Sequence, residues 1–124
     1  MIVKEFKTEI LEQDLTTYKI VDEGYQDNTI ISWCMGFIYT FGVLYKTQIQ
    51  ESYDTLFFDF KEDEAWDSRE RMYIGEGFHS SLTPDRYKNK KGLIVECTVP
   101  KGSEVIHGRT NLLVSNQIII NKIL

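Results

Sequence analysis

The residues best suited to chemistry lie in the stretch YIGEGFHSSLTPDR, residues 73–86. It places His79 between a Gly-x-Gly pair and two serines, Ser80 and Ser81, shortly before Thr83. Backbone amides at the start of a helix, together with three hydroxyl groups, can bind an anionic group. The stretch therefore predicts a phosphate or nucleotide subsite with an imidazole beside it.

A structural role for the same residues is the alternative. Acid–base catalysis needs a base that a third group orients, and Glu76 is the carboxylate closest to His79 in sequence. The histidine and the hydroxyl groups can instead satisfy buried backbone groups at a tight corner. We assign no catalytic residue and keep His79 and Ser80 as binding residues. The other histidine, His107, is typical of a surface turn.

An acidic segment, residues 59–70, is the second candidate. Its centre holds Asp63, Glu64, Trp66 and Asp67. Acidic side chains around an aromatic ring can imitate a nucleic-acid backbone toward a basic partner protein. A solvated loop is the alternative. Trp and Tyr rank among the residues that dominate interface energies, so we expect Trp66 to lead this group.

A basic cluster, RYKNKK, is the third candidate and contains Arg86, Tyr87 and Lys88. A solvated helix end is its alternative interpretation. Over the whole chain, 19 acidic residues outnumber 14 basic ones and give a net charge of −5. Nucleic-acid clamps normally present a basic surplus. We therefore expect the partner to be a protein or a protein–RNA complex that is not bound through its nucleic acid.

The two cysteines, Cys34 and Cys97, lie inside apolar runs with no second ligand at a metal-binding spacing. They are predicted to be buried free thiols, and neither a metal nor a cofactor is expected. No apolar run approaches the roughly 18 residues that cross a bilayer. The charged N-terminus also lacks the apolar middle of a signal peptide. We expect a cytoplasmic protein with no membrane partner.

Periodicity predicts short strands with little helix. Thr83, Pro84 and Asp85 are typical of a helix start and predict a helix over residues 84–90. A further two helical turns are expected over residues 8–15. The expected strands cover residues 1–6, 16–22, 29–39, 43–49, 55–60, 71–78, 92–99, 104–108 and 111–124. We expect the strand over 43–49 to pair with that over 29–39.

The length of 124 residues fits one domain, residues 1–124. The predicted fold class is α+β, a single domain dominated by antiparallel sheet with one to three short helices. An exposed terminal strand, QIIINKIL, would favour a homodimer through strand pairing.

Four motifs carry a resemblance: GFIYTFGVLYKT, YIGEGFHSSLTPD, IVECTVPKGSEVI and LLVSNQIIINKI, within residues 36–123. Together they resemble a group of short proteins of bacteriophages and mobile elements. The resemblance implies an accessory protein, and small acidic proteins of that origin are often inhibitors of host defence, including anti-CRISPR proteins.

A weaker resemblance is to the ADP-ribosyltransferase fold. FHSSL, VPKGSE and SNQIII follow one another as that fold's Ser-Thr-Ser strand, Pro-Lys-Gly turn and final Glu-x-Glu strand do. Where the family carries its catalytic glutamate, this chain offers Ser115 and Gln117. Neither can stabilise a developing ribosyl cation as a carboxylate would. NAD transfer chemistry is therefore not expected.

Taken together, these patterns predict a non-enzymatic binding protein that inhibits a host factor in the bacterial cytoplasm. Its predicted contact residues are the acidic segment (Asp63, Glu64, Trp66, Asp67) and the corner (His79, Ser80, Arg86, Tyr87, Lys88). The alternative is an ADP-ribosyltransferase-like or nucleotide-binding protein that uses the Gly-Phe-His-Ser corner.

Overall fold

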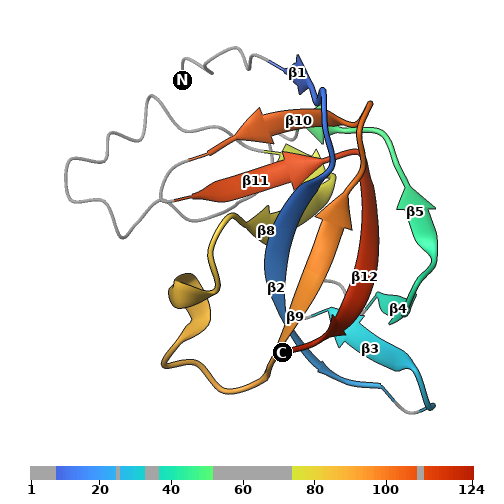
Figure 1. Cartoon of the computed structure of the whole chain (residues 1–124), viewed down its shortest axis with the longest axis vertical. Coiled ribbons are helices and arrows are strands. Elements are labelled where there is room, and N and C mark those ends of the chain that lie inside the picture. Colours follow the sequence, from blue (N-terminus) through green and yellow to red (C-terminus); the bar gives the residue numbers. More distant parts are fainter. Residues whose placement is uncertain (1–7, 25, 33–36, 52–73, 109–110) are drawn as a thin grey trace.

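The computed structural model describes residues 8–24, 26–32, 37–51, 74–108 and 111–124. Strands dominate this part of the chain (Figure 1). They are β1 (Glu9–Ile10), β2 (Leu15–Glu23), β3 (Thr29–Ser32), β4 (Ile38–Thr40), β5 (Leu44–Lys46), β6 (Gln50–Glu51), β7 (Ile74–Glu76), β8 (Phe78–Ser81), β9 (Leu93–Val99), β10 (Glu104–His107), β11 (Leu112–Ser115) and β12 (Gln117–Ile123). The helical element of the described part is a 3₁₀ turn, η2 (Pro84–Tyr87).

One large antiparallel sheet contains most of these strands. Its order is β1-β10-β11-β8-β2-β9-β12-β5, with β3 bridging β2 and β4, while β6 and β7 form a separate pair. Strand β2 pairs with β9 from Leu15–Val99 to Val21–Leu93. With β8 it shares the register pair Tyr18–Ser81. Figure 1 shows β10 and β11 running across the direction of β2, β9 and β12, so the sheet bends at the contact between β2 and β8.

The predicted α+β class is wrong, because the described chain is an all-β fold. The helix expected over residues 8–15 is replaced by extended chain. There Leu11 donates its N–H to Ser103 O, and Gly102 donates its N–H to Leu11 O. A tertiary partner for the backbone thus outweighs a weak local helical pattern.

The helix expected over residues 84–90 is only the 3₁₀ turn η2. Its start was predicted correctly, since Thr83 is extended and Pro84 follows it. Thr83, however, makes no side-chain cap hydrogen bond. Without that cap, and with Gly92 at a φ of +128° shortly afterwards, the segment turns back to the sheet and does not extend as an α-helix.

Several strand predictions are confirmed. The strand expected over 16–22 lies within β2, and that over 92–99 is β9. Along β9, Val95, Cys97 and Val99 are fully buried on one face, in the alternation typical of a strand with one face in the core. The chain then turns at residues 101–102, directly after Pro100. The strands expected over residues 1–6 and 55–60 lie outside the described residues.

Two predicted strands and one predicted pairing need correction. The run 29–39 forms two strands, β3 and β4, that pair with each other, with residues 33–36 outside the description. Strand β5 pairs with β12 and not with that run. The run 111–124 breaks at Asn116 into β11 and β12. Strand β12 lies between β9 and β5, so its residues 117–119 do not form the free edge that was expected, and the homodimer stays a prediction.

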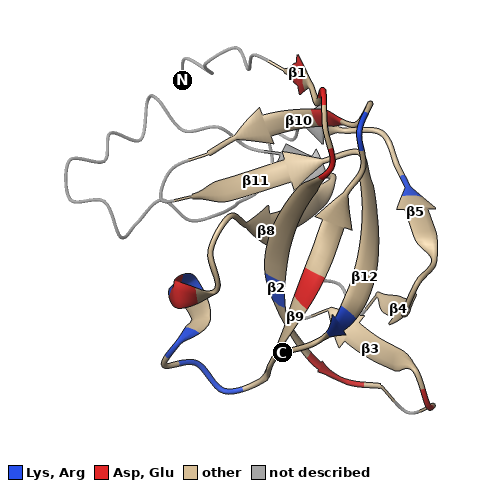
Figure 2. Cartoon of the chain, viewed as in Figure 1, with Lys and Arg blue, Asp and Glu red and all other residues tan. Residues whose placement is uncertain are grey.

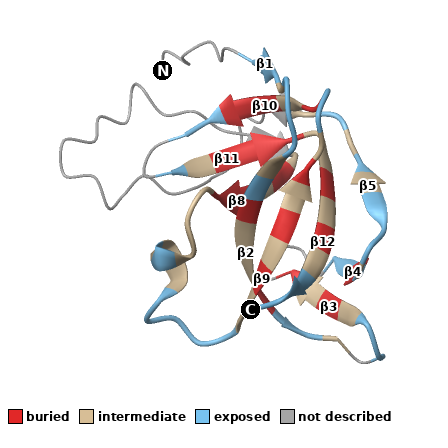
Figure 3. Cartoon of the chain, in the orientation of Figure 1, coloured by how far each residue is buried: buried red, intermediate tan, exposed pale blue. Residues whose placement is uncertain are grey.

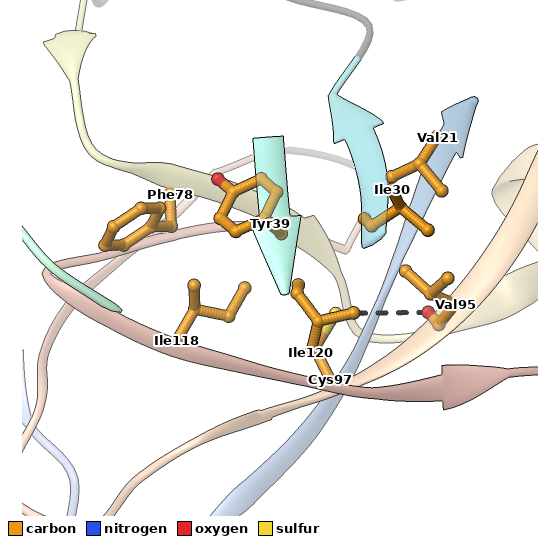
Figure 4. Packing of buried hydrophobic residues seen from close by; sticks show 8 residues of the cluster. All are labelled: Val21, Ile30, Tyr39, Phe78, Val95, Cys97, Ile118 and Ile120. Carbon is orange, nitrogen blue, oxygen red and sulfur yellow. Dashed lines mark hydrogen bonds between the residues drawn. The ribbon is translucent and has the colours of Figure 1, made fainter. Parts of the chain in front are cut away.

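The two core clusters lie on one face of the bent sheet, whereas Ile106 of β10 and Val114 of β11 are buried on the opposite face. The larger cluster joins the strands on the two sides of the bend between β2 and β8. It contains Val21, Ile30, Tyr39, Phe78, Val95, Cys97, Ile118 and Ile120 (Figure 4). A second cluster contains Val99, Val105 and Leu113, packed against Leu11 and Leu15. Full burial of each large aliphatic side chain contributes about 1.5–3 kcal/mol. In the described part of the chain, no helix has the length and hydropathy that crossing a bilayer requires.

Candidate functional site

The predicted corner around His79 is a strand. Residues Phe78–Ser81 form β8, where His79 pairs with Val114 and Ser80 with Leu113 of β11. Successive side chains of a strand point to opposite faces of the sheet. The hydroxyl groups of Ser80 and Ser81 therefore cannot gather around one anion, as the corner interpretation required.

His79 is partly buried and lies in the paired part of this strand. Its backbone carbonyl accepts a hydrogen bond from the Lys19 ammonium of β2. Burial lowers the pKa of the imidazole from 6.5 to about 4; the positive charge of Lys19 adds to the effect, and a hydrogen bond with the backbone of Gly77 opposes it. The ring is consequently neutral at neutral pH.

The interior beside β8 is polar as well as apolar. The hydroxyl groups of Ser80 and Thr17 are fully buried and have no hydrogen-bond partner. Lys19 lies between Thr17 and Val21 along β2, and its ammonium is 5.9 Å from the centroid of the Tyr39 ring. Burial raises the pKa of the nearby Cys97 thiol to about 12, so it stays protonated.

The basic residues that were predicted to share a corner with His79 lie on a different segment, in and after η2. Lys88, Lys90 and Lys91 are exposed on the segment after η2, and we call these three residues the basic corner. Figure 2 shows this segment projecting from the sheet. Arg86 and Tyr87 are half-buried, and burial raises the pKa of the Tyr87 hydroxyl. The structure thus brings Arg86, Tyr87 and Lys88 together, whereas it places His79 and Ser80 inside the sheet.

The acidic segment cannot be compared in the same way. Asp63, Glu64, Trp66 and Asp67 lie outside the described residues. They remain predicted contact residues.

Sequence reasoning missed a surface on β4 and β5. Phe37, Ile38, Val43 and Leu44 have exposed fractions of 47%, 55%, 41% and 42%. We call these four residues the β4–β5 patch. Figure 3 shows exposed segments along β4 and β5. No charged residue occurs between Phe37 and Tyr45, and this uncharged run is the signal in the sequence that could have indicated the surface.

Aromatic contacts restrain one of these four residues, Phe37. The Phe37 ring lies 4.7 Å from that of Tyr39 and 5.6 Å from that of Tyr45, and the Tyr39 and Tyr45 rings meet edge to face at 5.1 Å. The Tyr45 hydroxyl accepts a hydrogen bond of 2.7 Å from the N–H of Thr40. Since Tyr39 is buried in the core, it gives the exposed Phe37 ring a fixed contact.

Ser115 and Gln117, the residues at the positions of the transferase glutamates in the resemblance, make hydrogen bonds within the fold. Ser115 donates its hydroxyl to Gln117 O at 2.9 Å, and the Gln117 side chain donates to Ser103 Oγ at 3.3 Å. Between them, Asn116 accepts the Glu104 N–H at 2.8 Å through Oδ1. These contacts fix the bend between β11 and β12.

Among the described residues, no group of three or more His, Cys, Asp or Glu side chains is placed to hold a metal ion. No protein-family model, curated protein sequence or solved structure matches the chain significantly.

Proposed function

We propose that this chain is a binding protein that occupies a surface on a host protein or protein–RNA complex. In keeping with its resemblance to phage and mobile-element proteins, it would inhibit a host defence factor, as anti-CRISPR proteins do. The observation that carries the binding role is the β4–β5 patch. Exposed apolar side chains on neighbouring segments of the chain are typical of protein interaction sites.

Two further features support a protein partner. The aromatic contacts of Phe37 restrain its ring, so this side chain loses little freedom when a partner binds. The basic corner can speed association with an acidic surface through long-range attraction. We expect the β4–β5 patch to determine mainly the affinity for the partner, and Lys88, Lys90 and Lys91 to determine mainly the rate of association.

The test is capture of a partner from a lysate of the host bacterium by the immobilised protein, followed by binding measurements with the purified partner. The double variant Ile38→Ser, Leu44→Ser should weaken binding by roughly tenfold to a hundredfold. Ile10→Ser, Leu124→Ser is the matched control, since these side chains are also exposed, at 61% and 60%, but lie on other strands or the C-terminus. Equal binding by both double variants would disprove a role for the patch.

The basic corner has its own arm in this experiment. Charge reversal at Lys88, Lys90 and Lys91 should slow association and reduce its salt dependence. Reversal of the exposed Lys46, Lys101 and Lys122 makes the same change in charge elsewhere on the chain and should leave the rate closer to that of the wild type.

The ADP-ribosyltransferase-like or nucleotide-binding alternative is tested by calorimetry with NAD and with cyclic and linear nucleotides. Micromolar binding to the wild type that is lost in His79→Gln would support it. Turnover of any of these compounds would overturn the non-enzymatic proposal.

A further inference from the structure

Two buried hydroxyl groups without partners mark the interior next to β8. Thr17 Oγ1 and Ser80 Oγ are fully buried and make no hydrogen bond within the described part of the chain. The Thr17 hydroxyl does lie close enough to the Cys97 thiol to lower its pKa slightly, although the two do not meet in normal hydrogen-bond geometry. Each unsatisfied buried hydroxyl costs about 1–3 kcal/mol. A fold that keeps two of them needs a compensating partner.

Strand register places both groups at the contact between β2 and β8, which we call the seam. Thr17 pairs with Cys97 across β2 and β9. Because Tyr18 of β2 pairs with Ser81 of β8, Ser80 lies opposite Lys19, on the face of the sheet that carries the core clusters. The backbone pairing of β2 with β8 is confined to that single register pair in the described chain. The seam therefore has few backbone hydrogen bonds of its own and is lined by polar side chains.

The chemistry of the seam selects an oxygen ligand. Thr17 and Ser80 each offer a hydroxyl donor, and the Lys19 ammonium, which already donates to His79 O, adds positive charge. Cys97 remains a protonated thiol, and its sulfur lies 3.9 Å from Val95 O. Each hydroxyl can donate one hydrogen bond and accept two, so a water molecule complements both groups, and an oxyanion complements their donors and the positive charge of Lys19.

We propose that Thr17 and Ser80 form a buried site for a small oxygen ligand, either an ordered water molecule or a small oxyanion, that links β2 to β8. Buried waters typically make two to four hydrogen bonds to groups such as these. The ligand supplies the connection that backbone pairing does not supply at this seam. This inference does not depend on the proposed function.

The test compares the melting temperatures of Ser80→Ala, Thr17→Val and their double variant with that of Ser115→Ala. Ser115 is the matched control because its hydroxyl is equally buried but has a protein partner, Gln117 O. If a ligand binds Ser80, Ser80→Ala should lower the Tm about as much as Ser115→Ala does, by roughly 3–6 °C. Thr17→Val should also lower the Tm, and the double variant should lose less than the sum because both hydroxyls share one ligand.

Without a ligand, removal of an unsatisfied hydroxyl is neutral or stabilising. An unchanged or raised Tm in both single variants would therefore overturn the proposal. A second arm separates the two ligands. Phosphate or sulfate should raise the Tm of the wild type, relative to chloride at equal ionic strength, but not that of the double variant, if the ligand is an oxyanion. Water as the ligand gives no such difference and leaves the destabilisation of the single variants in place.

Discussion

At the scale of single residues, His79 shows how burial changes the chemistry expected from a residue type. In the sequence it lies between glycines and serines and is predicted to lie beside a phosphate or nucleotide subsite. In the structure it belongs to a paired strand, and its backbone carbonyl accepts a hydrogen bond from the Lys19 ammonium. Its pKa of about 4 keeps the imidazole neutral, and this has a consequence for stability.

Protonation of His79 should destabilise the fold in acid. The unfolded chain binds a proton near pH 6.5, whereas the folded chain does so only near pH 4. Between these values the unfolded state holds more protons, so stability is complete above pH 6.5 and is lost as the pH falls toward 4. The loss reaches about 3 kcal/mol.

Urea unfolding at pH 7 and pH 4.5 measures this effect. His79→Gln, which cannot be protonated in this range, should reduce the difference in unfolding free energy between the two pH values. His107→Gln is the matched control, because the His107 side chain is 44% exposed. The assignment to His79 would be wrong if both variants kept the full pH difference.

At the scale of elements, sequence patterns located many strands but not their partners. The alternation of β9 is readable because one face of that strand is buried and the other is not. The partner of β5 is not readable, since β12 follows it by more than 70 positions and adjacency in sequence favoured β4. Residues 8–15 were misread for the same reason: the backbone partners of Leu11 lie at Gly102 and Ser103.

The candidate sites follow the same pattern. The basic corner was predictable because charge and a proline turn are local properties. The β4–β5 patch was not, because an uncharged run has the same composition whether it faces the core or the solvent. Only the pairing of β3 with β4 and of β5 with β12 determines that Ile38 and Leu44 are exposed.

The junction between β7 and β8 provides a test of element packing. Gly77 has a φ of +140°, and a Cβ placed there would lie 2.4 Å from Val114 Cγ1. Gly77→Ala should therefore destabilise the fold by about 3 kcal/mol, from strain together with overpacking. Gly42, in the turn before β5, also has a positive φ, of +81°, but it has open space around it.

Gly42→Ala is thus the matched control, with an expected cost of about 1 kcal/mol from backbone strain alone. Chemical denaturation of both variants measures the difference. Equal losses would mean that the contact with Val114 has no energetic weight and that only the backbone angle matters.

At the scale of the whole molecule, one bent sheet separates the two exposed surfaces. The basic corner follows β8 on one side of β2 and β9, and the β4–β5 patch lies on the other side (Figures 1 and 2). The main core cluster joins the two halves, since Phe78 of β8 packs with Tyr39 of β4. The centre of the sheet should therefore be the most stable part of the chain.

Hydrogen exchange of backbone amides tests this order of stability. Strand β9 is flanked by β2 and β12, whereas β1 is two residues long and, in the described chain, pairs with β10 alone. The Cys97 amide should exchange most slowly, near the global unfolding rate, and the Ile10 amide should exchange orders of magnitude faster. Amide exchange followed by NMR at pH 7 gives both rates. Equal protection at the two positions would show that the sheet opens only as a whole, which contradicts a stable centre with a labile edge.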